Sequence, residues 1–131
     1  MAKILLLSHG NLADQFVKTA QMIVGEANNI KAIGLLTGED MDAYKNKIKS
    51  YLTKDSIPTL ILVDLFGGSP FITASLLYKD LKDSMKIEIV TGLNLGMLLE
   101  IMSNTNKELN VLANIAKQIG KDSIIQLSEK I

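Results

Sequence analysis

Short apolar runs recur along this chain at intervals of about thirty residues, the length of one strand–helix repeat. The runs have the length of strands and occupy residues 4–7, 30–36, 60–63 and 87–90. Each run is nearly continuous in apolar residues instead of alternating with polar ones. This pattern is typical of strands in a parallel sheet that is covered on both faces. The runs therefore predict the inner layer of an α/β fold.

Amphipathic helical patterns fill the intervals between the apolar runs. The predicted helices cover residues 12–24, 41–52, 69–79, 95–102 and 109–119. Gly25 and Gly120 stand where a glycine often ends a helix, and Ser69 before Pro70 predicts an N-cap followed by a first-turn proline. The alternation predicts a doubly wound α/β domain, with a mostly parallel sheet in the order 2-1-3-4 and helices on both faces.

The last apolar stretch, residues 123–127 (SIIQL), is predicted to form one more short strand. It follows a helix near the end of the chain, and no helix comes after it. It therefore lies outside the strand–helix alternation that predicts parallel pairing. We expect it to pair antiparallel or to pair with another subunit.

Composition excludes several classes of function. A chain of 131 residues fits one domain, covering residues 1–131. Lysines and acidic residues number 14 each, so the net charge of zero argues against nucleic acid and anionic membranes as partners. All basic residues are lysine, so backbone amides, hydroxyls or lysine would have to hold a phosphate. Without cysteine and with one histidine, we expect no metal site.

The N-terminal apolar stretch is too short to be a targeting or membrane segment. It spans residues 4–7 and ends at Ser8, far short of a signal-peptide core or a membrane span. We therefore expect a cytoplasmic protein. The sequence stops at Ile131 without a linker, which favours a free-standing subunit.

Two polar residues follow strands at the carboxyl edge of the predicted sheet. His9, the only histidine, follows the first run, and Asp64 follows the third. In the order 2-1-3-4 these strands are neighbours, and their side chains converge where open parallel sheets bind ligands. A carboxylate bonded to one ring nitrogen fixes the tautomer and leaves the other nitrogen as a nucleophile. We therefore predict that Asp64 orients His9 and that His9 attacks.

The segment GGSP after Asp64 can receive negative charge. Gly67 and Gly68 supply amides, Ser69 supplies a hydroxyl, and the helix that begins here supplies its positive end. We therefore predict that these three residues bind a phosphoryl group. Each feature alone also fits a turn or a helix cap, but their convergence with His9 at one edge of the sheet favours a function.

A second loop, residues 91–96 (TGLNLG), ends the fourth predicted strand. It belongs to the same edge of the sheet as His9 and Asp64. Thr91 and Asn94 in this loop, together with Phe66, are therefore predicted to form a wall of the pocket.

Three stretches resemble the IIA component of the mannose-type phosphoenolpyruvate-dependent sugar phosphotransferase system. They are SHGNLA at residues 8–13, VDLFGGSPF at residues 63–71 and GLNLGMLLE at residues 92–100. The resemblance runs nearly end to end. It implies a cytoplasmic phosphocarrier that accepts a phosphoryl group from phospho-HPr and passes it to a IIB component, which serves the membrane subunits IIC and IID.

The resemblance also assigns roles to residues. It implies that His9 is phosphorylated on the ring nitrogen remote from the backbone, that Asp64 bonds to its ring, and that residues 67–69 lie beside it. It implies a homodimer that exchanges its last strand, residues 123–127, and a site that needs no cofactor. Phosphoryl transfer between histidines is nearly balanced in free energy, so such a site needs positioning and charge stabilisation.

The sequence departs from the family pattern at two positions. Phe66 stands where many members have tryptophan, which keeps an aromatic wall. Gly96 stands where the family usually has proline. Because that proline would begin the fourth helix, we expect a looser first turn in this chain.

Three other functions fit parts of the pattern. A phosphocarrier subunit for dihydroxyacetone kinase shares the fold, although HG and GGSPF favour the sugar system. A receiver domain also ends its third strand in aspartate, but it needs an acidic pair where this chain has Ser8 and His9. A flavodoxin-like module for a nucleotide or flavin is disfavoured because the first loop lacks a glycine-rich fingerprint and the chain has no tryptophan.

Overall fold

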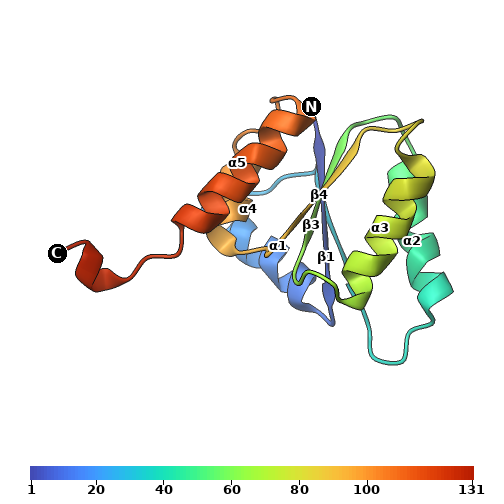
Figure 1. The fold of residues 1–131 in the computed structure, drawn as a ribbon, viewed down its shortest axis with the longest axis horizontal. Helices are drawn as coiled ribbons and strands as arrows, with labels where there is room; N and C mark the ends of the chain where they lie inside the picture. The colour runs from blue at the N-terminus through green and yellow to red at the C-terminus, as the bar shows by residue number, and fades with distance from the viewer.

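The computed structural model describes residues 1–131 and has a four-stranded sheet at its centre (Figure 1). The strands are β1 (Lys3–His9), β2 (Ile30–Leu35), β3 (Thr59–Val63) and β4 (Ile87–Thr91). All three strand pairs are parallel, and the order is β2-β1-β3-β4. The predicted fold class and strand order are confirmed.

Five α-helices cover the two faces of the sheet (Figure 1). They are α1 (Leu12–Val24), α2 (Met41–Thr53), α3 (Ser69–Leu81), α4 (Leu95–Met102) and α5 (Leu109–Asp122). The first, fourth and fifth helices pack on one face, and the second and third pack on the other. None of them combines the length and the apolar character that crossing a membrane requires.

Each face of the sheet encloses its own apolar cluster, because successive strand residues point to opposite faces. Ile4 and Leu6 of β1 belong to the cluster under α1, α4 and α5. Leu5 and Leu7 belong to the cluster under α2 and α3. This double burial explains why the strand sequences are continuously apolar.

The helix ends follow the local sequence signals in part. α1 ends before Gly25, whose φ of 93° lies in the region that favours glycine. α3 differs from the prediction, because Gly68 is its N-cap and Ser69 is already its first helical residue. Gly68 has the extended backbone of a capping residue, and Pro70 still lies in the first turn.

Gly120 does not end α5, contrary to the prediction. The helix continues through it to Asp122, and Gly120 is buried. A Cβ atom at this position would lie 2.7 Å from Cε of Met97 in α4. The glycine therefore lies at a close contact between two helices and does not mark the end of one.

Residues 123–131 form no strand within the single chain. They extend away from the sheet and contain only a short 3-10 helix, η1 (Leu127–Glu129) (Figure 1). The side chains of Ile124 and Leu127 are 82% and 72% exposed. The predicted strand at residues 123–127 therefore does not pair with this chain's own sheet, and pairing with a second subunit stays a prediction.

A buried lysine joins the start of β1 to the end of α2. Lys3 Nζ donates to the main-chain oxygen of Tyr51 at 2.8 Å and lies 3.0 Å from Asp55 Oδ1. It also lies 4.2 Å above the centre of the Tyr51 ring. The hydrogen bond from Lys3 lowers the pKa of the Asp55 carboxyl group. This ion pair therefore makes the free energy of unfolding depend on pH.

We expect Asp55→Asn to lower the free energy of unfolding at neutral pH, because the buried Lys3 ammonium loses its counter-charge. The pKa of Asp55 is lowered in the folded state, so its contribution is present above the unfolded-state pKa. It is lost as the pH falls through the folded-state value. The difference between wild type and variant should therefore shrink below about pH 4. Urea unfolding across this range measures it, with the exposed Asp83→Asn as control. A difference that does not depend on pH would contradict this assignment.

Candidate active site

The structure brings His9 and Asp64 together at the carboxyl edge of the sheet. His9 is the last residue of β1, Asp64 follows β3, and these strands pair with Leu7 opposite Val63. Nδ1 of the His9 ring lies 2.9 Å from Oδ2 of Asp64. The main-chain N–H of His9 donates to the same oxygen at 3.0 Å. One carboxylate oxygen therefore holds both the backbone and the ring of His9.

This arrangement leaves the second ring nitrogen free. With the proton on Nδ1 and donated to Asp64, Nε2 carries the lone pair and has no hydrogen-bond partner in the protein. The His9 side chain is 50% exposed, whereas the Asp64 side chain is only 11% exposed. Oδ1 of Asp64 is buried and has no partner, so the hydrogen bonds of this carboxylate are directed at His9 alone. In chemical terms, this arrangement is able to present Nε2 as an oriented nucleophile.

Gly68 lies directly against the His9 ring. A Cβ atom at Gly68 would lie 2.7 Å from Cε1 and 3.1 Å from Nε2 of that ring. Gly67 has a φ of 83°, which favours glycine. The two glycines therefore let the chain turn and pass beside Nε2 of His9.

The N-terminus of α3 begins beside the same ring. Gly68 is the N-cap of this helix, and no side chain caps its first amides. The first N–H groups of a helix have no partner within the helix, and together they bind anions. The hydroxyl of Ser69, the first helical residue, makes no hydrogen bond within the protein. Gly68 thus brings the start of α3 next to His9, and Ser69 is the first residue of that helix.

The second set of predicted residues lines a neighbouring cavity. Phe66, Thr91 and Asn94 border a cavity of about 480 Å³ beside β4, which Lys117 and Lys121 of α5 also line and His9 does not. Phe66 is 72% exposed, and its ring packs against that of Phe71 with an angle of 48° between the ring planes. The predicted wall therefore belongs to a hollow next to the His9 site.

Asn94 has a structural role that the sequence analysis did not assign. Its Oδ1 accepts from the main-chain N–H of Met97 at 3.0 Å, which caps α4. Its Nδ2 donates to the main-chain oxygen of Gly120 at 3.2 Å. An asparagine directly before a helix is a usual N-cap, and this signal could have identified the role.

Gly96 makes room for the segment that follows α5. A Cβ atom at Gly96 would lie 2.8 Å from Cβ of Ser123. Oγ of Ser123 lies 3.0 Å from Oδ1 of Asn94 and 2.8 Å from the oxygen of Gly120. α4 still begins at Leu95, because Asn94 caps it without a proline. Gly96, which replaces the proline expected from the family pattern, thus lies where the start of α4 closely contacts the end of α5.

The turn after His9 is held by residues of β2 that the sequence analysis did not single out. Gly10 has a φ of 55°, and its N–H donates to the oxygen of Leu35 at 2.7 Å. Its own carbonyl oxygen occupies the space that a Cβ atom of Gly34 would need. No local signal marks Gly34, because the constraint comes from a neighbouring segment of the chain.

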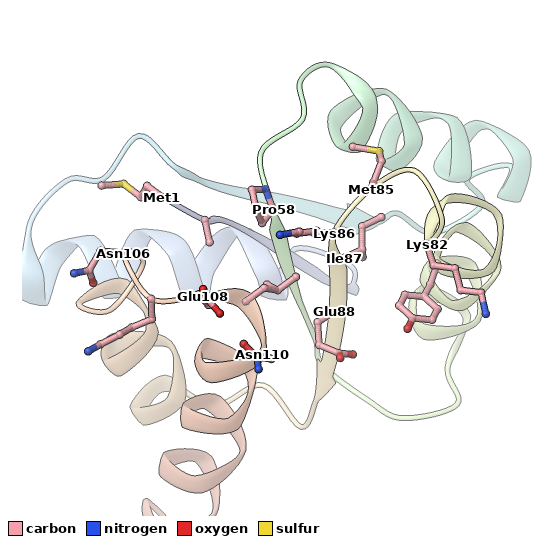
Figure 2. Close-up of a pocket in the computed structure, with 14 residues that line it drawn as sticks. Met1, Pro58, Lys82, Met85, Lys86, Ile87, Glu88, Asn106, Glu108 and Asn110 are labelled. Atoms are coloured by element: carbon pink, nitrogen blue, oxygen red, sulfur yellow. The ribbon is translucent and has the colours of Figure 1, made fainter.

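Another cavity lies at the opposite edge of the sheet. Figure 2 shows this hollow of about 630 Å³, which Pro58 and Ile87 border at the amino ends of β3 and β4. Lys82 and Asn110 line it from the end of α3 and the start of α5. His9 and Asp64 line neither this hollow nor the larger cavity of about 800 Å³ beside β2, so the size of a cavity does not point to this pair.

Comparison with known proteins identifies the family. The family described as "PTS system fructose IIA component" matches residues 3–119. The chain belongs to this family of phosphotransferase-system IIA components. The resemblance drawn from the sequence is therefore confirmed.

Known members are similar along most of this IIA chain. The fructose-specific EIIA component of Bacillus subtilis (strain 168) is 30% identical, covering 100% of this chain and 90% of that protein. The mannose-specific EIIAB component of Escherichia coli (strain K12) is 31% identical over 97% of this chain, which spans only 40% of that protein. The crystal structure of an EIIA component from Streptococcus agalactiae has a TM-score of 0.91 and 27% identity, covering 98% of this chain and 99% of that one.

We expect Gly68→Ala to displace the His9 ring, because the new methyl group would collide with it. His9 is the only histidine, so its ring nitrogens give unambiguous NMR signals, and both should shift. Gly25→Ala is the matched control, since its φ of 93° imposes strain but nothing lies within 4 Å of the new atom. That control should lose about 1–3 kcal/mol of stability and keep the wild-type ring signals. Unchanged ring signals in Gly68→Ala would refute the contact.

Proposed function

We propose that this protein is a cytoplasmic phosphocarrier of a sugar phosphotransferase system. His9 accepts a phosphoryl group from phospho-HPr and passes it to a IIB component, which supplies the membrane subunits IIC and IID. The observation that carries the proposal is the 2.9 Å contact between His9 Nδ1 and Asp64 Oδ2, which leaves Nε2 free beside the start of α3. Membership of the IIA family supports the same chemistry.

The proposed step is an exchange of one nitrogen–phosphorus bond for another. The lone pair on His9 Nε2 attacks phosphorus, and the bond from phosphorus to the donor's ring nitrogen breaks with its electron pair returning to that nitrogen. The His9 ring keeps its Nδ1 proton and becomes positively charged. Oδ2 of Asp64 stabilises that charge, so the ring remains a good leaving group for the next transfer.

The protein supplies positioning and charge stabilisation for this step. We expect the amides at the start of α3 and the hydroxyl of Ser69 to contact the phosphoryl oxygens, because α3 begins beside the His9 ring. Gly68 brings these groups close because it has no side chain. The chain has no arginine, so amides and a hydroxyl take the place of a guanidinium.

We also infer a homodimer in which each chain adds its C-terminal segment to the sheet of the other. β4 is an edge strand, so one side of its backbone is free to pair. Residues 123–127 leave the body of the protein and expose Ile124, Ile125 and Leu127. If residues 123–127 of each copy paired antiparallel with β4 of the other, the exposed side chains of this segment would be covered. The segment would also cover the cavity beside β4 of the other copy.

Incubation with phosphoenolpyruvate, Enzyme I and HPr should add one acid-labile phosphate to this protein. Mass spectrometry should locate it on His9, and His9→Gln should remain unlabelled. Asp64→Asn should fold normally but accept the phosphate about 10²- to 10⁴-fold more slowly, because an amide can hold the wrong tautomer. Asp83→Asn, an exposed carboxylate far from the site in the sequence, is the matched control.

Other outcomes of the same assay discriminate between the rival functions. Labelling of Asp64 by acetyl phosphate with magnesium would indicate a receiver domain. Transfer from the phosphorylated protein to a dihydroxyacetone kinase, but not to a IIB component, would indicate the kinase system. A phosphate on any residue other than His9 would contradict the proposal.

Sedimentation velocity should show a dimer for the wild-type protein. Ile125→Asp should shift it toward monomer, because a charge would have to be buried in the exchanged strand. Ser128→Asp adds the same charge within η1, outside the proposed strand, and should leave the dimer intact. A wild-type monomer, or equal effects of both variants, would contradict the exchange of residues 123–127.

A further inference from the structure

Ser8 is a fully buried polar residue that the proposed chemistry does not use. It lies in β1 directly before His9, and its exposed fraction is 0%. Burying a hydroxyl group is unfavourable unless hydrogen bonds compensate for the lost water. The hydrogen bonds of Ser8 therefore indicate why a serine stands at this position.

The hydroxyl of Ser8 caps the first helix from the preceding strand. Its Oγ accepts from the main-chain N–H of Ala13 at 2.7 Å, and it lies 3.4 Å from the carbonyl oxygen of Gly10. Asn11, the residue at the N-cap position of α1, makes no capping bond with its side chain. Ser8 thus replaces the usual N-cap and spans the turn that contains His9.

The backbone of His9 is consequently held from both sides. Before it, Ser8 is fastened to the first turn of α1. After it, the N–H of Gly10 donates to Leu35 of β2 at 2.7 Å. The N–H of His9 itself donates to Asp64, so a shift of this backbone would disturb both bonds to the carboxylate. The ring geometry depends on the turn as well as on Asp64.

We propose that Ser8 is a positioning residue for phosphoryl transfer at His9. Its hydroxyl locks the strand–turn–helix segment and thereby keeps the His9 ring bonded to Asp64 through Nδ1. The proposal deepens the function proposed above and rests on it for the transfer step. Removal of the hydroxyl leaves the buried Ala13 N–H without a partner, and the turn must move to satisfy it.

Three substitutions test this role through the ring nitrogens of the only histidine. At a pH where the ring is neutral, ¹⁵N NMR of the wild type should show mainly the Nδ1–H tautomer. Ser8→Ala should lower that fraction and slow phosphate acceptance from phospho-HPr about 10- to 100-fold. Ser8→Thr keeps the hydroxyl and should restore both. Thr59→Val is the matched control, since it removes a buried hydroxyl at the opposite edge of the sheet.

The outcomes separate this proposal from the proposed function. A wild-type tautomer fraction in Ser8→Ala would overturn the proposal. Equal losses of tautomer fraction and transfer rate in Ser8→Ala and Ser8→Thr would also overturn it, because they would assign the effect to side-chain volume and not to the hydroxyl. If Ser8→Ala does not fold, Ser8→Cys replaces it, and a wild-type tautomer there overturns the proposal. The tautomer is measured without a phosphoryl donor. If Ser8→Ala has an altered tautomer but the wild type is not phosphorylated, the proposed function is refuted and the positioning role of Ser8 stands.

Discussion

One carboxylate oxygen fixes the position of His9 at the carboxyl edge of the sheet. Oδ2 of Asp64 accepts from the main-chain N–H of His9 and bonds to Nδ1 of the same residue. The main-chain N–H of Asp64 in turn donates to the oxygen of Leu7 at 3.1 Å, which continues the pairing of β1 with β3. The carboxylate is thus fixed to the sheet through both its own backbone and that of His9. A ring held in this way keeps its orientation when its charge changes.

The two central strands make that interaction possible. β1 and β3 are covered on both faces, so residues 4–7 and 60–63 are apolar and buried, and polar residues occur only at the strand ends. The first residues free to be polar are therefore those that meet at the strand ends. Gly68 then lies directly against the His9 ring, where a Cβ atom would come within 3.1 Å of Nε2. The buried core of the sheet and the partly exposed His9 are therefore only a few residues apart in the sequence.

Local sequence patterns predict those features of the fold that depend on residues close together in the chain. The apolar runs indicate the strands, and the order 2-1-3-4 places His9 beside Asp64. Gly34 and Gly120 could not be interpreted in this way, because their roles depend on segments distant in the sequence. Asn94 carries a local N-cap signal, and only its bond to Gly120 depends on a distant segment. Gly120 resembles a helix end but serves a contact with α4, and Asn94 resembles a pocket residue but links α4 to α5. Such contacts become visible only when the helices are placed in space.

The two outer strands of the sheet, β2 and β4, differ in their surroundings, and this difference affects which of them is able to pair with a second chain. The hollow along β2 is lined by four lysines, Lys18, Lys31, Lys47 and Lys54. Lysines along an edge strand discourage pairing with another chain, because a second strand would bury their charges. The cavity beside β4 has two lysines and six apolar residues, so this edge presents less charge and more apolar surface. If the exposed apolar segment after α5 joins a second sheet, the free edge of β4 is therefore the favoured place.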